Sequence, residues 1–433
     1  MSYDNMLFGG NDSRGDPSAQ SADSSAFISG RAKIRVIGVG GAGNNAVNRM
    51  IEAGITSAEY IAVNTDAQIL ACNKASTKIQ IGVKKTKGLG AGADPDLGRE
   101  AAEESKEQLS AAIADTDLLF ITAGMGGGTG TGAAPVIARL AKEQKDKKIL
   151  TVAVVTEPFD FEGRRRMDNA MKGIDNLRKY VDTLVIIPNE KISEVVPKNA
   201  TMTEALRVAD EVLKQGIRGI ADLIVTPALI NLDFADVRTI LKDRGLAHMG
   251  VGVAKGENRI IDAVRLAVNS PLLDTTIEGA TGVILNIVGG PDLTLDEVRK
   301  AAGLIHGVVD FSANIIFGAC IDEEIQDEVE VTVIATGFPS AEELVDTVSR
   351  SAGYAPVRGG ETPRANPYGQ QNGYQAPRSP YATPAPAPMP EPQPYELEPS
   401  VQQPVEPEGP EEDDSPTGKR LPPFVERLFG KKK

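Results

Sequence analysis

The sequence predicts an α/β protein, in which a doubly wound, Rossmann-like domain is joined by a long central helix to a second, smaller α/β domain, with disordered termini. Three observations lead to this prediction. Short apolar runs alternate with helical patterns from residue 33 onward, glycine clusters stand between predicted strands and helices, and the composition changes abruptly near both ends of the chain. At 433 residues, the chain is long enough to build two cores.

The first half of the chain reads as buried strands alternating with amphipathic helices. Short, continuous apolar runs are typical of parallel strands that are covered on both faces. The predicted strands are Ile34–Val39, Tyr60–Val63, Leu118–Ile121, Ile149–Val155 and Leu184–Ile187. The predicted helices between them are Asn45–Glu52, Arg99–Ile113, Ala133–Lys142 and Arg164–Tyr180.

A longer helix follows, from about Thr203 to Ile224, with apolar residues at three- and four-residue spacing. Such a helix can connect two domains while one of its faces is buried. The pattern then predicts a second α/β domain that ends near Phe338. Its expected strands are Gly250–Ala254, Val283–Val288, Ile315–Ile321 and Val329–Thr336, and its expected helices are Arg259–Val268 and Leu295–Leu304.

Composition sets the expected domain boundaries. Residues 1–30 are rich in serine, aspartate and glycine, and residues 351–418 are rich in proline, so neither segment can bury a core, and we predict disorder in both. Between them we place a nucleotide-binding domain over 31–200, the central helix with the loop after it over 201–231, and the second domain over 232–340. A short, basic and apolar peptide over 419–433 ends the chain.

Bulk composition excludes several classes of protein. The formal net charge of −14 argues against a nucleic-acid binder, because affinity for phosphate backbones depends on clustered lysine and arginine. The cysteines, Cys72 and Cys320, are too few for a disulfide framework, and the histidines, His248 and His306, have no cysteine partners for a zinc site. The sequence has neither a membrane-spanning run nor a signal peptide, so we expect a cytoplasmic protein.

The first glycine cluster lies in "IRVIGVGGAGNNAV", where Gly38, Gly40 and Gly43 have the G-x-G-x-x-G spacing between a strand and a helix. In that context backbone N–H groups and the helix N-terminus can face an anion. Taken alone, the motif favours a Rossmann dinucleotide site, with Asp66 as the ribose partner. A nicotinamide- or flavin-dependent oxidoreductase is therefore the alternative function, and tight packing of helix on strand is the simpler structural explanation.

The second glycine cluster, "AGMGGGTGTGAAP", also follows an apolar run and precedes a helix. A Rossmann dinucleotide site does not need a second loop of this kind. Its backbone amides, with the hydroxyls of Thr129 and Thr131, could hold further phosphate oxygens, so the two loops together suggest two or three phosphates. A P-loop is excluded, because the Gly-Lys pairs of the chain, at 418–419 and 430–431, lie in the tail.

The second cluster resembles the G-G-G-T-G-T-G signature of the tubulin/FtsZ GTPase family. The stretches "VIGVGGAGNNAVNRMI", "VVTEPFDFEGRRR" and "INLDFADVRTI" resemble further motifs of that family in the same order, and the resemblance covers about Ile34 to Phe338. It implies that the first domain is a GTPase domain that binds GTP or GDP with Mg²⁺. It also implies that copies of the chain polymerise head to tail into filaments, which form the cytokinetic Z ring at the mid-cell division site.

The resemblance implies roles for individual residues. Those near the phosphates are Gly41, Ala42, Gly43, Asn44 and Asn45 in the first loop, Gly126, Gly127, Gly128, Thr129, Gly130 and Thr131 in the second, and Ala91, Gly92 and Ala93 in a loop that senses the terminal phosphate. Glu162 and Arg166 match residues that hold the ribose and the guanine side, and Asp210 matches the residue that reads the base. The competing explanations are a solvated i,i+4 pair for Glu162 and Arg166 and a surface helix position for Asp210.

Asp233, Asp236 and Asn231 are the candidate catalytic residues. The two aspartates stand three apart at the start of a predicted helix, where Asp233 would also suit an N-cap. The resemblance implies that they orient water and cation beside the GTP of the next subunit. The glycine loops hold neither a P-loop lysine nor an obvious carboxylate to position water, so a partner could supply the missing part. No metal site built from the chain's own residues is predicted.

The terminal peptide "KRLPPFVERLFGKKK" resembles the family's docking peptide. The resemblance implies that Leu421, Pro422, Phe424 and Val425 bind membrane-tethering and regulatory division proteins, so that membrane contact is indirect. The alternative is direct lipid contact through Phe424, Val425, Leu428 and Phe429 on one helical face beside the basic groups. We favour protein docking, because a short peptide with two prolines makes a poor membrane helix.

Overall fold

The computed structural model describes residues 32–197, 199–226, 230, 232–270, 277–323 and 325–338. The predicted N-terminal arm, the proline-rich linker and the terminal peptide lie outside these residues. So do the candidate catalytic residue Asn231 and the four candidate docking residues, Leu421, Pro422, Phe424 and Val425.

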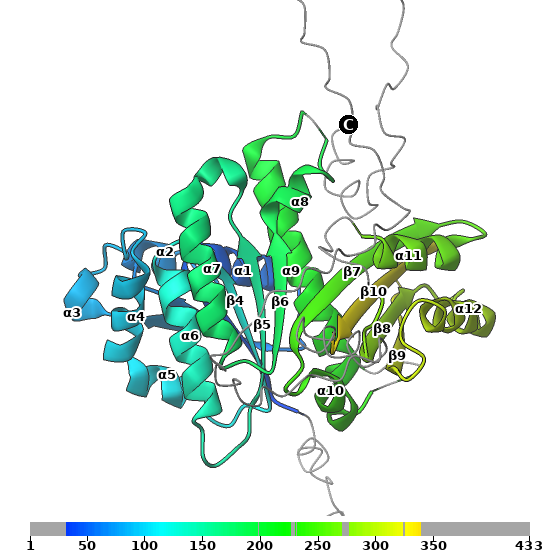
Figure 1. Ribbon diagram of the computed structural model, residues 1–433, viewed down its shortest axis with the longest axis horizontal. Helices are drawn as coiled ribbons and strands as arrows, with labels where there is room; N and C mark the ends of the chain where they lie inside the picture. The colour runs from blue at the N-terminus through cyan, green and yellow to red at the C-terminus, as the bar shows by residue number, and fades with distance from the viewer. Residues whose placement is uncertain are drawn as a thin grey trace, which may run out of the picture. The chain divides into compact units, whose positions relative to one another are not determined.

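The described chain is built on one ten-stranded sheet with the order β3-β2-β1-β4-β5-β6-β7-β10-β8-β9 (Figure 1). The first six strands in this order are parallel, as the continuous apolar runs predict. They are β3 (Thr77–Gln80), β2 (Glu59–Asn64), β1 (Ile34–Val39), β4 (Leu118–Gly124), β5 (Leu150–Glu157) and β6 (Thr183–Pro188).

The remaining four strands belong to the second half of the chain. They are β7 (Gly245–Lys255), β10 (Glu328–Thr336), β8 (Gly282–Gly289) and β9 (Asn314–Ile321). Strand β10 is antiparallel to both of its neighbours, and β9 lies parallel to β8 at the edge. The two predicted α/β parts thus share one sheet, which continues where Thr183, Leu184 and Val185 of β6 pair with Gly245, Leu246 and Ala247 of β7.

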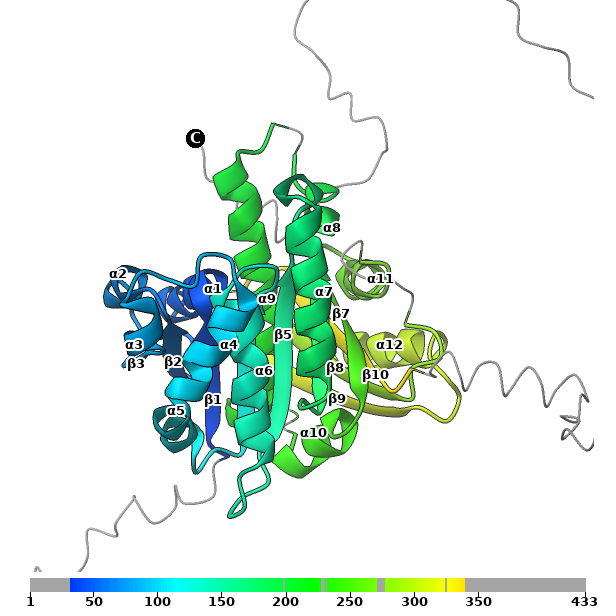
Figure 2. The same cartoon turned by 60° about the vertical axis from the view of Figure 1, so that its left-hand side comes forward.

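Helices cover both faces of the sheet (Figure 2). One face packs against α1 (Gly40–Glu52), α9 (Met202–Val225) and α10 (Phe234–Leu241). The other face packs against α4 (Pro95–Glu104), α5 (Lys106–Ile113), α6 (Thr129–Lys142) and α7 (Arg164–Arg178) in the first half, and against α11 (Arg259–Val268) and α12 (Leu295–His306) in the second. Helix α9 contacts strands of both halves, which is the connecting role that its apolar stripe predicts.

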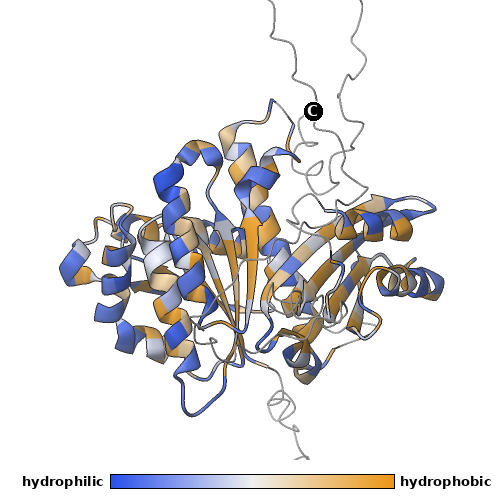
Figure 3. Ribbon diagram, in the orientation of Figure 1, coloured by the Kyte–Doolittle hydropathy of each residue, from blue (hydrophilic) through white to orange (hydrophobic). Residues whose placement is uncertain are grey.

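The side chains of a strand alternate between these two cores. In β4, Leu118 and Phe120 lie in the core under α1 and α9, whereas Leu119 and Ile121 lie in the core under α6 and α7. Both sets must be apolar, so the strand reads as an unbroken apolar run. Figure 3 shows the resulting apolar sheet with the polar sides of the helices turned outward. Among the helices of the described chain, none is long and apolar enough to span a bilayer.

Several elements differ from the sequence prediction. The single helix expected over 99–113 is wrong: α4 ends and α5 begins at Ser105, whose hydroxyl accepts a hydrogen bond from the Gly82 N–H at 3.1 Å. Strand β3 and the short helices α2 (Ala67–Ala71), α3 (Val83–Thr86) and α8 (Asn189–Ser193) were not predicted. Elements of four or five residues are too short for a hydrophobic period to reveal them.

Candidate functional site

A cavity of about 710 Å³ lies at the carboxyl ends of β4 and β5, beside the end of β1. Both glycine clusters line it, through Gly41 and Ala42 at the start of α1 and through Gly127, Gly128, Thr129 and Gly130 at the start of α6. The first backbone N–H groups of a helix have no intrahelical partner, and the helix dipole favours negative charge there. Two long helices that begin at one cavity make it a site for a polyanion.

Within these clusters, Gly41 and Gly127 leave space for a ligand. A Cβ atom built on either residue meets no atom within 4 Å. Gly40 instead has a positive φ of 73°, and its Cβ would lie 2.8 Å from the Gly130 nitrogen, so the two clusters touch each other. This contact brings the starts of α1 and α6 to one wall of the cavity.

Other glycines of the same clusters serve packing. A Cβ atom on Gly43 would lie 2.3 Å from the Thr122 carbonyl oxygen in β4, and one on Gly132 would lie 2.0 Å from the Pro95 carbonyl oxygen in α4. Backbone at this distance leaves no room for alanine. The packing explanation therefore accounts for part of each cluster, while the open glycines face the cavity.

The two threonine hydroxyls of the second cluster make internal hydrogen bonds. The Thr129 hydroxyl lies 2.6 Å from that of Thr65 at the end of β2, and the Gly126 N–H donates to the Thr131 hydroxyl at 2.9 Å. Thr129 lines the cavity, whereas Thr131 does not. These bonds hold the loop in shape, and each hydroxyl keeps further hydrogen-bonding capacity.

The loop with Ala91, Gly92 and Ala93 folds over the second glycine cluster. Ala91 and Ala93 line the cavity, and a Cβ on Gly128 would lie 2.8 Å from that of Ala91. Ala93 has a positive φ of 59°, which is uncommon for a residue with a side chain. The loop ends at Asp94, whose carboxylate accepts the N–H groups of Asp96 and Leu97 as the N-cap of α4.

Glu162 and Arg166 also line the cavity and form an i,i+4 ion pair. The Glu162 carboxylate also accepts a hydrogen bond from the Phe159 N–H at 3.0 Å. The i,i+4 ion pair that was the competing explanation for these two residues is therefore present, and both residues also line the cavity. The half-exposed Arg166 side chain can turn toward a ligand without losing buried contacts.

Asp210 lies in α9 beside α1 and does not line the cavity. Arg49 of α1 donates to its carboxylate at 2.7 Å, and the carboxylate is largely buried. Burial raises the pKa of Asp210 above the usual range, and the Arg49 hydrogen bond opposes that shift. A pair of this kind fixes α9 against α1.

Unpartnered amide groups surround the same region. Asn44 is 1% exposed, and neither its amide nitrogen nor its amide oxygen has a partner in the described chain. Asn64 and Asn189 line the cavity, and each also has one buried amide atom without a partner. Buried polar atoms cost free energy unless something satisfies them, so these atoms fit a site that closes around a polar ligand.

Seven residues named for the nucleotide do not line the cavity: Gly43, Asn44, Asn45, Gly92, Gly126, Thr131 and Asp210. Sequence reasoning in turn missed the polar wall residues Asn64, Thr156, Glu157 and Asn189 and the apolar rim residues Phe161, Met202 and Leu206. Asn64, Thr156 and Asn189 each follow a predicted strand. The carboxyl ends of parallel strands are where such sheets bind ligands, so that signal could have found them.

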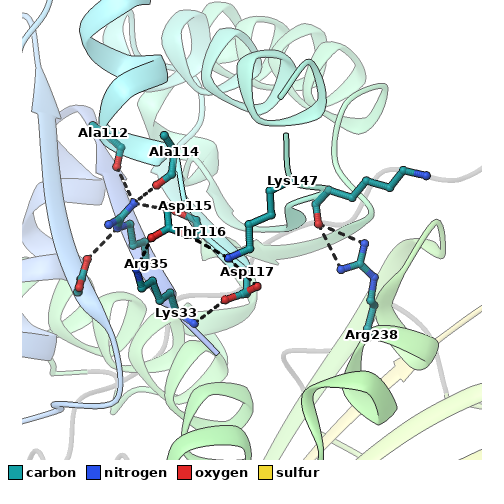
Figure 4. Close-up of polar contacts among 11 residues, drawn as sticks. Lys33, Arg35, Ala112, Ala114, Asp115, Thr116, Asp117, Lys147 and Arg238 are labelled. Carbon is teal, nitrogen blue, oxygen red and sulfur yellow. Dashed lines mark hydrogen bonds and ion pairs between the residues drawn. The ribbon is translucent and has the colours of Figure 1, made fainter. Parts of the chain in front are cut away.

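Asp233 and Asp236 lie at the other end of the sheet. Both are exposed, and Asp233 occupies the N-cap position of α10 without a side-chain capping bond. The Arg238 guanidinium fixes α10 near the amino end of β5 through two 3.2 Å hydrogen bonds to the Lys148 carbonyl oxygen (Figure 4). The eight residues of β5 then separate α10 from the cavity by roughly 25 Å. The two aspartates cannot reach the cavity of their own chain.

A metal cage is not preformed in the described part of the chain, where no three histidine, cysteine or acidic side chains gather around one point. Mg²⁺ commonly takes one or two carboxylates with substrate phosphates and water instead. Asp66, which was considered as a ribose partner, lies on the cavity wall, but one of its oxygens already caps α2.

The family model described as "Tubulin/FtsZ family, GTPase domain" matches residues 33–197, and the one described as "FtsZ family, C-terminal domain" matches residues 245–339. Together they span the described sheet from β1 to β10.

Solved structures are similar over most of the described chain. An empty FtsZ dimer from M. jannaschii is 49% identical, with a TM-score of 0.69, and the match covers 72% of this chain and 90% of that one. A point-mutant FtsZ from the same organism gives the same identity and TM-score over 93% of its length. A GTPγS-bound CetZ2 protofilament from Haloferax volcanii, at 22% identity and a TM-score of 0.60 over 74% of this chain and 98% of that one, shares the fold.

Proposed function

Since the chain belongs to the tubulin/FtsZ family, we propose that it is a filament-forming GTPase whose active centre is completed by the neighbouring chain. The family assignment makes it a tubulin-like GTPase that binds guanine nucleotide. The nicotinamide- or flavin-dependent oxidoreductase alternative is set aside, because the matched first domain is a GTPase domain.

One observation carries the proposal: the glycine-lined cavity and the two candidate catalytic aspartates lie at opposite ends of β5. Neither end is sufficient alone. The cavity offers backbone amides and amide side chains for binding, and α10 offers two exposed carboxylates. A head-to-tail contact would place the aspartates of one chain at the cavity of the next.

In this proposal the cavity holds GTP or GDP. Phosphates lie against the starts of α1 and α6, where Gly41 and Gly127 leave room, and the loop with Ala91, Gly92 and Ala93 senses the terminal phosphate. Glu162 and Arg166 hold the ribose and the guanine side, Asp210 reads the base, and Asn44, whose amide atoms have no partner in the described chain, lies near the phosphates. Mg²⁺, held by phosphate oxygens and water, would neutralise phosphate charge.

Asp233 and Asp236 would orient a water molecule beside the terminal phosphate of the neighbouring chain's nucleotide, together with Asn231. Phosphoryl transfer needs mostly positioning and charge stabilisation, so a few groups added by a neighbour can control it. A head-to-tail contact is heterologous and produces an open filament when its rotation does not close. The similar structures include an FtsZ dimer and a CetZ2 protofilament, which supports self-association of this chain.

We extend the proposal to the cell. The filaments would form the cytokinetic Z ring in the cytoplasm at the mid-cell division site. Residues 351–418 would act as a flexible tether, and the terminal peptide 419–433 would bind tethering and regulatory division proteins through Leu421, Pro422, Phe424 and Val425. Membrane contact would then be indirect.

The test is to follow right-angle light scattering and phosphate release together after GTP and Mg²⁺ are added over a range of protein concentrations. We expect scattering to appear above a threshold concentration, with turnover per chain rising at the same threshold. Turnover per chain that stays constant from well below to well above the threshold would show that each chain hydrolyses GTP alone.

A further inference from the structure

A second cavity, of about 200 Å³, lies at the amino end of β5, on the side where α10 is attached. Four cationic side chains line it: Lys142, Lys148, Arg238 and Lys242. Two acidic side chains, Asp182 and Asp243, share the cavity, so its lining carries a net positive charge in a chain whose formal net charge is −14. We name these four cations the basic pocket.

The charges of the basic pocket are poorly neutralised. The Lys142 ammonium donates to the Lys179 carbonyl oxygen at 3.1 Å, and the Arg238 guanidinium donates to the Lys148 carbonyl oxygen. The Lys148 ammonium has no partner among residues 32–338 as described, and that of Lys242 lies 3.9 Å from the exposed Asp243 carboxylate. By contrast, the nearby Lys147 lies between Asp115 and Asp117 and is fully paired (Figure 4).

Asp182 neutralises the pocket only in part. Burial raises the pKa of its carboxylate, and the nearby charge of Arg238 opposes that rise. The carboxylate also accepts backbone N–H bonds from Thr151 at 2.8 Å and Asp243 at 3.4 Å, and the four cations still outnumber the two acids of the lining. Its role is to close the turn beside β5. The pocket therefore presents positive charge toward solvent, and its natural ligand is an anion.

The described chain ends beside this pocket. Strand β10 finishes at Thr336, which pairs with Ala247 at the start of β7. A Cβ atom on Gly337 would lie 3.3 Å from the Arg244 guanidinium, and Arg244 directly follows Asp243 of the pocket. The last described residues, Gly337 and Phe338, therefore lie at the same end of the sheet as the basic pocket.

The chain that follows carries the opposite charge. Residues 379–418 contain no lysine or arginine. Six acidic residues fall close together within them, which we call the acidic segment: Glu406, Glu408, Glu411, Glu412, Asp413 and Asp414. The acidic segment begins 68 residues after Phe338, and a flexible chain of that length has a root-mean-square span of about 45 Å. Tethering at that distance gives an effective concentration of order 1 mM, enough for weak ion pairs to be populated.

We propose that the acidic segment binds the basic pocket of its own chain. The bound segment would lie against Arg238 and Lys242 at the C-terminal end of α10, the helix whose N-terminal end carries Asp233 and Asp236. Binding would be weak, reversible and sensitive to ionic strength, because the charges on both sides are exposed. The inference is independent of the GTPase mechanism and stands or falls on its own test.

The test measures the distance between the two parts in the full-length chain. Dyes are attached at Asp146→Cys, in the exposed loop between Lys142 and Lys148, and at Ser415→Cys, next to the acidic segment, with the exposed Cys72 replaced by serine. Single-molecule energy transfer at high dilution reports on separate chains. We expect a close population at low salt that disappears at about 0.5 M salt, where screening acts over only a few ångströms.

Charge variants decide which groups are responsible. K142E with K242E should lower the ratio of bound to free chains about fivefold, and so should replacement of Glu411 and Glu412 by lysine. Combining the two pairs should restore the close population. The matched control, K84E with K106E, changes two exposed lysines elsewhere and should match the parent chain. The proposal is overturned if the control variant loses the close population as fully as the pocket variant does, or if the combined variant does not recover it. It is also overturned if energy transfer is seen only between dyes on separate chains.

Discussion

The two ends of β5 are built in different ways. At the carboxyl end, backbone amides, open glycines and buried amide side chains line a cavity of about 710 Å³. At the amino end, α10 presents the exposed side chains of Asp233 and Asp236. The first end has what a nucleotide needs for binding, and the second has carboxylates of the kind that hydrolysis needs.

This difference explains why binding and turnover should separate cleanly in variants. A binding site formed by backbone amides needs glycine where the ligand approaches the chain, so replacing such a glycine with a residue that has a side chain weakens binding. A pair of exposed carboxylates supports little of the fold, so it can be removed at small cost in stability. Variants at the two ends should therefore fail in different measurements.

The largest expected effect is on turnover. Asp233→Ala should reduce the GTP turnover number by about 10³-fold, because it removes a group that positions the attacking water, while nucleotide affinity stays within about twofold. Steady-state phosphate release and equilibrium dialysis check the two numbers. Asp262→Ala, which removes an exposed acid in α11, is the matched control and should behave like the parent chain. If Asp233→Ala instead lost nucleotide affinity, the division between the two ends would be wrong.

A second pair of variants separates ligand space from packing within one helix. Gly41→Ala adds a methyl group to open space on the cavity wall, so nucleotide affinity should fall about tenfold with little change in stability. Gly43→Ala forces a Cβ atom to within 2.3 Å of the Thr122 carbonyl oxygen, and the free energy of unfolding should fall by about 3 kcal/mol. Thermal unfolding and equilibrium dialysis distinguish them, and a reversal of the two outcomes would contradict the structure.

A smaller effect is expected at an ion pair remote from both ends of β5. The Arg259 side chain, which is buried, donates to Glu297 at 2.7 Å, and this bond lowers the pKa of Glu297 to about 2. A lowered carboxylate pKa adds stability above its usual value of 4.5, and that stability is lost as pH falls from 4.5 toward about 2. Glu297→Gln should therefore cost about 2 kcal/mol at pH 7 and almost nothing near pH 2.

Urea unfolding at several pH values measures this contribution. The parent chain should lose stability more steeply than the Glu297→Gln variant over that acidic range. GTP turnover at pH 7 should be unchanged in the variant. If Glu297→Gln lowered GTP turnover as much as Asp233→Ala does, this ion pair in the second half of the chain would contribute to the active centre. That result would contradict the assignment of activity to the two ends of β5 alone.

Strong local patterns made much of the fold predictable. The parallel strands of the first half other than β3, the helix α9 and the strands of the second half were expected, because each of these elements is long enough for its apolar pattern to show. The join between β6 and β7 was not expected. It depends on three residue pairs that are distant in sequence, and no local pattern announces it.

The candidate site was predictable where a sequence motif coincides with backbone geometry. The glycine clusters pointed to the starts of α1 and α6, although the sequence could not tell that Gly41 is open while Gly43 is packed against Thr122. The apolar rim at Met202 and Leu206 was missed, because these residues come to the cavity only through the long-range placement of α9. The roles of Asn231 and of the terminal peptide stay predictions.

Mixing two inactive variants tests the central claim most directly. Gly41→Leu should fill the cavity wall and prevent nucleotide binding, and Asp233→Ala should bind nucleotide without cleaving it. If one chain's aspartates serve the next chain's nucleotide, an equimolar mixture should recover about a quarter of the parent turnover, since about one head-to-tail junction in four joins an intact cavity to intact aspartates. A mixture that shows no more turnover than the sum of its two components would contradict the claim.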